Sequence, residues 1–594
     1  MGIFNFEEAQ SIGEVRGVDT SRVFIQVHSA EKLSHARVGR LVTIQGLDGN
    51  EWLLGMINRV WRDPLENDAK DSEAFPEETV PVIVENNGVQ VALVGTYRVK
   101  QGKIDNYFTR AILSLPDINR PVFPVEGKAL EAFMGIIGSA SGAVKKPLEI
   151  GTYTLDRKAK AYIDGDKLFQ RHAALLGSTG SGKSWSVANI LEQAAKLDCS
   201  NIIVFDLHGE YTQLPYAQQL RVAGPGDLAN PKEGTLFLPF WLLNYDEMQS
   251  MLIDHSEQSA PNQSLAVLDA ITKAKMSVLD KLGKKEVLET FTVDSPIPFK
   301  MEQIVQELEY KNVENIGSGE FYESGKKAGQ EKTTQGPLNN KLTRLLIRLK
   351  NKLEDRRYGF LFQPPEKWYE YEALHYLANL LMGHKGISGY GKPGIKVIDF
   401  SEVPSDVLPV MVSLAARLVF QIQFWSDPGT NNDGRHPILL LCDEAHLYLP
   451  SAAKTTNPLE RKALENFERI AKEGRKYGVG LLIVSQRPSD VSTTILSQCN
   501  NVISLRLSND SDKAVVKGLM PDSLSGLIEI LPGLEIGEAI VVGDAILLPT
   551  RIVLNKPEHK PLSATIDFWQ RWESPKGVSD LVKAVEQLRR QSRI

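Results

Sequence analysis

Short β-like runs rich in apolar residues fill much of the first hundred residues. The pattern recurs at 22–27, 40–44, 52–60, 80–84 and 91–99, with turn-forming residues between the stretches. Several short strands at close spacing, with little helical periodicity, are typical of a small antiparallel barrel. We therefore predict a small N-terminal β-barrel domain over residues 1–130. The acidic, proline-containing residues 63–81 are expected to form a long exposed loop.

The pattern changes beyond residue 150 to apolar runs that alternate with helical stretches. The runs are 173–176, 201–205, 395–400, 438–442, 479–485 and 502–507, and the helical stretches are 185–196, 408–424 and 459–472. Runs of this kind suit strands covered on both faces of a parallel sheet, so an α/β fold is predicted. Residues 538–553 are expected to close the sheet as a hairpin around Gly543 and Asp544.

The α/β core is predicted to be interrupted by an insertion and followed by a tail. Its two parts, 131–244 and 393–555, flank a helical insertion over 245–392, and a polar tail over 556–594 follows. The tail contains an amphipathic helix near 578–590, which we expect to pack on a neighbouring subunit.

The clearest amphipathic helix of the insertion spans residues 337–355. One of its faces is apolar and another is basic; the basic residues are Lys341, Arg344, Arg348 and Lys352. The basic face is either a stripe that faces DNA or a neighbouring subunit, or an ordinary solvated face, which is the commoner case.

A glycine-rich loop follows the apolar run 173–176. It reads Gly177, Ser178, Thr179, Gly180, Ser181, Gly182, Lys183 and Ser184, and Trp185 begins the helical stretch after it. Such a loop directs backbone N–H groups at phosphate oxygens, and the helix N-terminus adds partial positive charge. Lys183 is expected to reach the β- and γ-phosphates, and the Ser184 hydroxyl to ligate Mg²⁺. The sequence therefore predicts binding of a nucleoside triphosphate, with ATP and Mg²⁺ as cofactors.

Two adjacent carboxylates follow the apolar run 438–442. Asp443 can hold the Mg²⁺ shell, and Glu444 can polarise a water for attack on the γ-phosphate. The alternative is a surface pair at the start of a loop. With the phosphate loop present, the pair indicates an ATPase.

Two further polar residues end predicted strands, and each allows two interpretations. Gln486 either senses the γ-phosphate or caps a loop, and Asp206 either faces the nucleotide or caps its own loop. The residues alone leave both pairs of alternatives open.

Length, composition and charge fit a large ATPase and limit its partners. The chain has 594 residues, 42% hydrophobic and 24% charged, so two or more domains are expected. Its three cysteines are too few for a disulfide framework, and no signal peptide or membrane-spanning run is evident, so we expect a cytoplasmic protein. Because the net charge is −6, DNA contacts would have to come from a local basic patch.

Together these motifs make the chain resemble the HerA family of the FtsK–HerA superfamily, and specifically its bacterial members. The matching pieces are Arg171-His172 before the phosphate loop, Asp206-Leu207-His208-Gly209-Glu210-Tyr211, Cys442-Asp443-Glu444-Ala445-His446, Glu473-Gly474-Arg475-Lys476-Tyr477-Gly478-Val479, Ser485-Gln486-Arg487-Pro488-Ser489, Ser497-Gln498-Cys499-Asn500 and Leu531-Pro532-Gly533-Leu534. The resemblance covers essentially the whole chain and is weakest over 281–336.

The resemblance implies a RecA-like P-loop core and a homo-hexameric ring that threads double-stranded DNA. ATP would bind between neighbouring subunits, with Arg475 acting in trans, Arg469 a weaker candidate for that role, and Arg171 beside the nucleotide in cis.

The resemblance also implies a partner. This would be a nuclease of the NurA type, in DNA-end processing, or a sirtuin-like or other effector, in anti-phage defence. Two alternatives stay open: an ATPase ring that serves as a scaffold for an effector enzyme, and a conjugation- or secretion-type ATPase.

Overall fold

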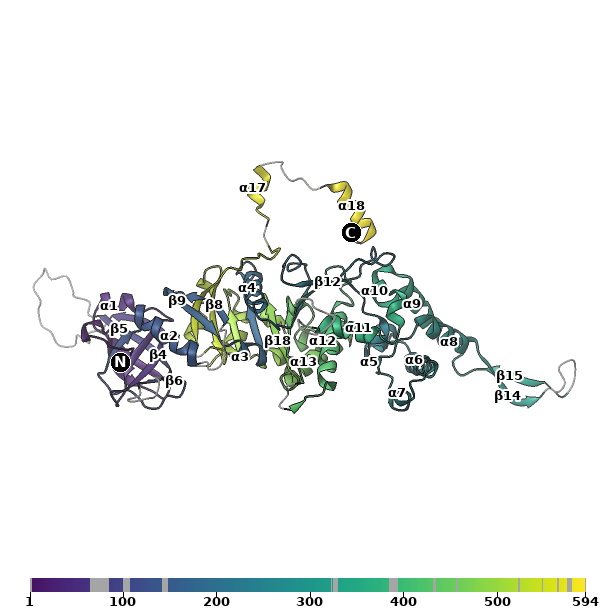
Figure 1. The fold of residues 1–594 in the computed structure, drawn as a ribbon, viewed down its shortest axis with the longest axis horizontal. Coiled ribbons are helices and arrows are strands. Elements are labelled where there is room, and N and C mark those ends of the chain that lie inside the picture. The colour runs from purple at the N-terminus through teal and green to yellow at the C-terminus, as the bar shows by residue number, and fades with distance from the viewer. Residues whose placement is uncertain are drawn as a thin grey trace, which may run out of the picture. The chain divides into compact units, whose positions relative to one another are not determined.

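The computed structural model describes most of the chain. The residues it leaves undescribed are 1–2, 65–84, 100–106, 141–147, 322, 324–329, 384–393, 431–433, 456–457, 522–523, 547, 564–565, 574–579 and 593–594. The chain divides into two compact units, Met1–Ala194 with Leu481–Lys560, and Ala195–Gly480 with Pro561–Ile594. Figure 1 shows the elements of both.

The first unit begins with a closed barrel. Its strands are β1 (Gly13–Val18), β2 (Arg22–Val27), β3 (Leu41–Gln45), β4 (Glu51–Pro64), β5 (Glu85–Arg98), β6 (Tyr107–Thr109) and β7 (Pro121–Pro124). They pair in the order β2-β1-β7-β3-β4-β5-β6, and β2 also pairs with β5, which closes a ring of six strands with β6 outside it. Apolar side chains such as Val15, Ile25 and Leu53 fill the interior. The predicted small barrel is confirmed.

The barrel strands differ in detail from the expected ones. The two longest, β4 and β5, pair with each other along most of their length and are the long purple strands of Figure 1. Residues 63–64, expected in the loop, belong to β4. The expected strand 80–84 and the rest of the loop 63–81 lie outside the described residues.

The ATPase part of the first unit is a mixed sheet. Its strands are β8 (Leu148–Tyr153), β9 (Asp156–Ile163), β10 (Ala173–Leu176), β18 (Val479–Ser485, from Leu481 on), β19 (Asn501–Ser504), β20 (Glu538–Gly543) and β21 (Thr550–Leu554). Strand β10 runs parallel to both β18 and β19, while β19, β20, β21, β8 and β9 pair antiparallel in that order. The expected closing hairpin is the pair β20–β21. Helix α2 (Gly127–Ala140) precedes the sheet, and helices α3 (Gly165–Gln170) and α4 (Lys183–Ala195) flank β10 in sequence.

The second unit contains a parallel sheet. Strands β11 (Ile202–Asp206), β12 (Gln218–Val222), β13 (Thr235–Leu236), β16 (Ile395–Asp399) and β17 (Ile438–Cys442) lie in the order β13-β12-β16-β11-β17. Strands β11, β16 and β17 are buried along their whole length and mostly apolar because both faces are covered. Helix α12 (Leu408–Trp425) packs on α13 (Pro458–Glu473), which ends in the 3-10 helix η8 (Gly474–Tyr477).

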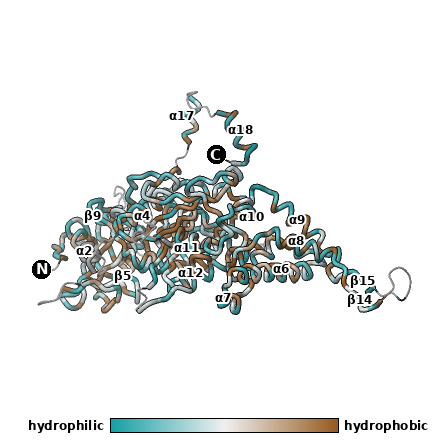
Figure 2. Tube along the Cα trace, turned by 45° about the vertical axis from the view of Figure 1, so that its right-hand side comes forward, coloured by the Kyte–Doolittle hydropathy of each residue, from teal (hydrophilic) through white to brown (hydrophobic). Residues whose placement is uncertain are grey.

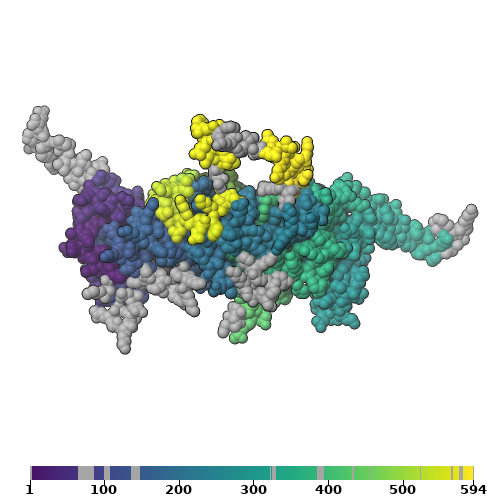
Figure 3. Space-filling view, turned by 45° about the horizontal axis from the view of Figure 1, so that its top comes forward, coloured from purple at the N-terminus to yellow at the C-terminus, as the bar shows by residue number. Residues whose placement is uncertain are grey.

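The insertion is mainly helical, as predicted, but it also contains a hairpin that the sequence did not indicate. The helices are α5 (Tyr245–Leu252), α6 (Ala260–Lys281), α7 (Lys285–Thr290), α8 (Met301–Val313), α9 (Thr343–Glu354), α10 (Gly359–Phe362) and α11 (Ala373–Met382). Between α8 and α9, strands β14 (Asn315–Phe321) and β15 (Glu331–Gln335) form an exposed antiparallel arm, the narrow teal projection in Figure 3.

Two of the four residues of the predicted basic face are engaged within the insertion. Arg348 pairs with Glu257 at 2.6 Å, and Lys352 lies over the ring of Tyr358, 4.8 Å from its centroid. These contacts support the interpretation of this face as an ordinary one rather than as a free basic stripe.

One described helix, α12, is long and apolar enough to cross a membrane by length and composition. However, 72% of that stretch is buried inside the structure, which is typical of a core helix. Figure 2 shows α11 and α12 as largely hydrophobic segments.

The tail contains helices α17 (Phe568–Glu573) and α18 (Leu581–Arg590), so the amphipathic helix near 578–590 is confirmed. Trp569 and Leu588 are among the exposed apolar side chains of these helices. Packing of the tail on a neighbouring subunit stays a prediction.

A buried ion pair joins the insertion to the sheet-covering helices. Arg417 of α12 donates to both carboxylate oxygens of Glu247 in α5, at 3.0 and 2.7 Å. Asn466 of α13 donates to the same carboxylate at 3.1 Å. The two charged side chains are 8% and 2% exposed, so each depends on the other for a charge partner.

We predict that Arg417→Met lowers stability by roughly 3–5 kcal/mol, because it leaves the Glu247 carboxylate buried without its charge partner. Calorimetric melting of the full chain measures the effect. The matched control is Lys332→Met, which breaks an exposed pair with Glu320 and should cost less than about 1 kcal/mol. Equal melting of the two variants would contradict the prediction.

Candidate nucleotide site

The glycine-rich loop connects β10 to α4 and requires glycine at particular positions. Gly182 has φ +103°, a conformation that side-chain-bearing residues rarely adopt. A Cβ at Gly177 would lie 2.6 Å from Ser181 Oγ and 2.8 Å from Leu505 Cβ. The loop is therefore compact, with its backbone turned tightly over the carboxyl end of β10.

The loop is held by the segments beside it. The N–H and the hydroxyl of Ser178 both donate to the carbonyl of Arg506, each at 2.9 Å, and the N–H of Gly537 donates to the carbonyl of Ser181 at 3.0 Å. Lys183 is buried and its Nζ donates to the Ser178 carbonyl at 3.3 Å, so the amine lies over the loop. Sequence patterns gave no signal for Arg506 and Gly537, because their contribution is made by backbone atoms.

Gln486 lies at the phosphate loop. The Thr179 hydroxyl donates to Gln486 Oε1 at 2.6 Å. The carboxyl ends of the parallel strands β10 and β18 meet at one sheet edge, which brings these two residues together. Of the two interpretations left open, this contact supports the one in which Gln486 serves the nucleotide.

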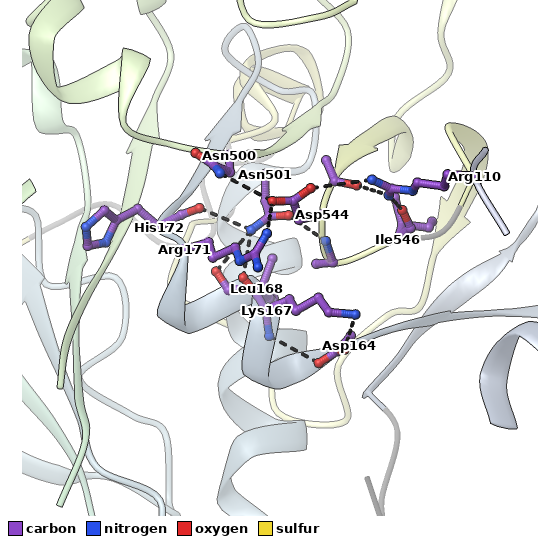
Figure 4. Close-up of polar contacts among 12 residues, drawn as sticks. Arg110, Asp164, Lys167, Leu168, Arg171, His172, Asn500, Asn501, Asp544 and Ile546 are labelled. Atoms are coloured by element: carbon purple, nitrogen blue, oxygen red, sulfur yellow. Dashed lines mark hydrogen bonds and ion pairs between the residues drawn. The ribbon is translucent and has the colours of Figure 1, made fainter. Parts of the chain in front are cut away.

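Arg171 lies at the other end of β10. It precedes the strand whereas the phosphate loop follows it, and four strand residues separate the two by about 13 Å. Its guanidinium forms an ion pair with Asp544, in the turn between β20 and β21 (Figure 4). The structure therefore does not bring Arg171 to the phosphate loop of its own chain, as the expected role in cis would require.

The Asp544 carboxylate has two further partners, one of which, Arg110, belongs to the barrel domain. Asn500 Nδ2 donates to it at 3.3 Å, and Arg110, just after β6, approaches it at 3.4 Å and donates to the carbonyl of Gly543 at 2.5 Å (Figure 4). Burial raises the pKa of Asp544, but the hydrogen bonds from Arg171 and Asn500 and the two arginine charges outweigh burial and lower it. The carboxylate is thus held ionised between two arginines.

In the second unit, Asp443 and Glu444 follow β17 directly. Asp443 is buried, and burial raises its pKa well above the ordinary value; the charges of Glu444, Glu210 and Asp206 raise it further. Among the described residues no cationic side chain forms an ion pair with Asp443. A buried oxygen ligand among like charges fits a divalent cation, so Asp443 suits the expected role in holding Mg²⁺.

Glu444 has a strained backbone and a partner that the sequence did not identify. Its φ of 44° lies in the left-handed region, which non-glycine residues rarely occupy and which is common at functional sites. His446 Nδ1 lies 3.3 Å from Glu444 Oε2, and both side chains are largely buried. The motif contained His446, but only the structure shows that its ring lies beside this carboxylate.

Asp206 caps its own loop. Its Oδ1 accepts the N–H groups of His208, Gly209 and Glu210, and its Oδ2 accepts that of Tyr211 at 2.8 Å. Both oxygens are thereby occupied, so the capping interpretation accounts for this residue. Its remaining influence on the site is electrostatic, through Asp443.

The two candidate trans arginines differ in their surroundings. Arg469 donates to Glu473 at 3.3 Å and lies over the Phe420 ring, 5.3 Å from its centroid. Arg475, in η8, is exposed and makes no side-chain hydrogen bond or ion pair with the described residues. The available guanidinium is therefore that of Arg475.

A phosphate loop on a parallel strand, with carboxylates and a glutamine at strand ends, defines a P-loop ATPase with a RecA-like core. Residues 148–419 match the family model for the central domain of the helicase HerA, and residues 407–547 match the model for the HerA-like C-terminal domain. The chain belongs to the HerA family of FtsK–HerA-type ATPases.

Relatives agree with this assignment. A probable helicase of Methanocaldococcus jannaschii is 27% identical over 428 residues, which cover 72% of this chain and 70% of that protein. The DNA double-strand break repair helicase HerA of Saccharolobus solfataricus is 27% identical over 407 residues, 68% of each chain. The protein of the same name from Pyrococcus furiosus is 26% identical over 466 residues, which cover 72% of this chain and 74% of that protein.

Solved structures show more distant similarity. The bacterial conjugative coupling protein TrwB, in an unbound form, is 13% identical, with a TM-score of 0.43, over 73% of this chain and 93% of that chain. VirB4 of Thermoanaerobacter pseudethanolicus is 15% identical, with a TM-score of 0.39, over 69% of this chain and 97% of that chain.

Neutralising Asp443 should change the stability of the fold in a way that depends on pH. A raised pKa means that the folded state binds the proton of Asp443 more tightly, so this carboxyl reduces stability as pH rises above about 4, the ordinary aspartate value. We predict that Asp443→Asn raises the melting temperature at pH 7, measured without Mg²⁺, and raises it less at pH 5.

The comparison variant is Asp206→Asn. Burial raises the pKa of Asp206 too, but the amide of the variant would oppose one of the four N–H donors, so this variant should gain less stability than Asp443→Asn. Destabilisation of both variants to the same degree would mean that Asp443 stabilises the fold.

Proposed function

We propose that this chain is an ATP-driven double-stranded DNA translocase that works as a homo-hexameric ring with a partner nuclease or effector. The observation that carries the proposal is the hydrogen bond between Thr179 of the phosphate loop and Gln486 at the end of β18. This hydrogen bond links the phosphate loop to Gln486, a side chain able to respond to the γ-phosphate. Through such a contact, the loss of the γ-phosphate on hydrolysis can change the conformation of the segment after β18.

Each site residue has a stated role in this proposal. The phosphate loop, with Lys183 and the first turn of α4, binds the triphosphate; Ser184 and Asp443 hold Mg²⁺, which neutralises charge on the phosphates. Glu444 accepts the proton of the attacking water, with His446 fixing its carboxylate. Gln486 aligns that water.

Two arginines are proposed to act across the subunit boundary. Arg171 precedes β10 and Arg475 precedes β18, whereas the phosphate loop and Gln486 follow those strands. The Arg171 guanidinium is therefore at the end of β10 remote from the phosphate loop of its own chain. Arg475 is exposed in η8 of the second unit, where a neighbour's nucleotide could reach it. These positions favour trans action for Arg475 and revise the expected cis role of Arg171. A guanidinium supplied in trans makes hydrolysis depend on the ring.

The HerA relatives named for DNA double-strand break repair support DNA as the substrate. With a net charge of −6, this chain must concentrate basic side chains locally to hold DNA. The proposed translocase would act in DNA-end processing or in anti-phage defence. The barrel is the proposed docking surface for the nuclease or effector, whether NurA-like or sirtuin-like, because small barrels offer loops and strand edges to partners.

The second candidate is an ATPase ring that assembles and activates an effector enzyme, with translocation secondary. The engagement of Arg348 with Glu257 favours it, because α9 then offers fewer free cations to DNA.

We predict that purified protein hydrolyses ATP and that linear duplex DNA raises the turnover several-fold. Lys183→Ala should abolish turnover, because the β- and γ-phosphates lose their cation. Steady-state phosphate release measures both. Turnover that is indifferent to DNA would contradict the motor and favour the scaffold, and undiminished turnover in Lys183→Ala would contradict the site itself.

We predict that Arg475→Ala reduces turnover by about 10³-fold or more while ATP affinity stays within a few-fold of wild type. Its matched control is Arg469→Ala, six residues earlier on the same segment, which should retain most of the turnover. Turnover and nucleotide binding are measured on assembled rings. Normal hydrolysis by Arg475→Ala would remove this assignment.

A further inference from the structure

The two sides of the phosphate loop have different neighbours. Strand β10 lies between β18 and β19, parallel to both. Gln486 at the end of β18 contacts Thr179, so the β18 side is the one where the γ-phosphate would react. The nucleoside end of a bound nucleotide would then extend to the β19 side, which is built by Arg506 and the segment before β20.

An exposed aliphatic side chain lies on the β19 side. The N–H of Gly537 donates to the carbonyl of Ser181, and its nitrogen lies 3.3 Å from where a Cβ of Gly182 would be. The residue before it, Ile536, is 70% exposed. A large apolar side chain thus reaches solvent directly beside the phosphate loop.

An aromatic side chain lies on the first turn of α4. Trp185 follows Ser184, and the Nζ of Lys560 lies 5.7 Å from the centroid of its ring. The ring is partly exposed. Cation–π contact of this kind fixes the orientation of an indole ring.

A strap of chain beyond β21 holds Lys560 in this position. The carboxylate of Glu192 accepts the backbone N–H groups of Glu558 at 2.9 Å and of His559 at 3.4 Å. Glu192 and Trp185 are seven residues apart, two turns along one face of α4. The strap therefore follows that face from Glu192 towards the phosphate loop. The same anchoring brings the side chains of Glu558 and His559 close to that of Glu192.

We propose that Trp185 and Ile536 flank the base of the bound nucleotide, and that Lys560 keeps the indole ring in place. An aromatic ring and an aliphatic side chain at the mouth of a phosphate site offer a planar base two apolar surfaces. The proposal rests on the proposed function, since it requires that the loop bind a nucleotide. It gives the strap after β21 a role in ligand binding.

The test compares two ligands that share the phosphates and differ in the base. Calorimetric titration of the full chain measures the affinity of a non-hydrolysable ATP analogue and of inorganic triphosphate. Ile536→Ser and Trp185→Leu should each weaken the ATP analogue about tenfold and triphosphate less than about twofold, as expected for loss of base stacking. Lys560→Met should do the same more weakly.

Ile536→Ser changes a solvent-exposed side chain, so the fold tolerates it, and Ile316→Ser on β14 is the matched control, expected to leave both affinities unchanged. Equal weakening of both ligands, or no weakening of either, would overturn the base-flanking role. Failure of the wild-type protein to bind either ligand would instead overturn the proposed function.

Discussion

The phosphate loop depends on hydrogen bonds from neighbouring strands more than on its own residues. A carbonyl at the end of β19 accepts twice from Ser178, and Gly537 donates to Ser181 from the segment before β20. These bonds form only because β10 and β19 run parallel in register and place their carboxyl ends at one edge. The conformation of the phosphate loop therefore depends on the sheet, and a movement of β19 or β20 would change the position of the loop.

The buried carboxylates among the described residues are of two kinds: some have cationic or N–H partners, and others do not. Glu247 and Asp544 are paired with arginines, and Asp206 accepts four backbone N–H groups, although burial still raises the pKa of Asp206. Asp443 is buried among like charges with no cationic side chain paired to it, and Glu444 has a left-handed backbone that costs energy to maintain. Both features reduce the stability of the fold, and they occur at the two adjacent residues that we propose as metal ligand and base.

Much of this could be predicted because buried parallel strands and a glycine-rich loop leave strong sequence patterns. The hairpin β14–β15 could not, since its exposed strands have no apolar period to detect. The sequence could not decide whether Asp206 caps its own loop or faces the nucleotide, because a carboxylate at the end of a strand can adopt either orientation. Arg171 is different: it precedes the strand that the phosphate loop follows, so strand direction alone puts the two at opposite ends, against the cis role expected from family resemblance.

We propose that each site is completed by a neighbouring subunit, and mixed rings are the test of this proposal. Lys183→Ala and Arg475→Ala chains should each be inactive alone, for different reasons. In a ring assembled from both, some interfaces pair an intact phosphate loop with an intact arginine, so the account predicts that mixing restores part of the ATP turnover. Co-assembled rings that stay inactive would contradict it.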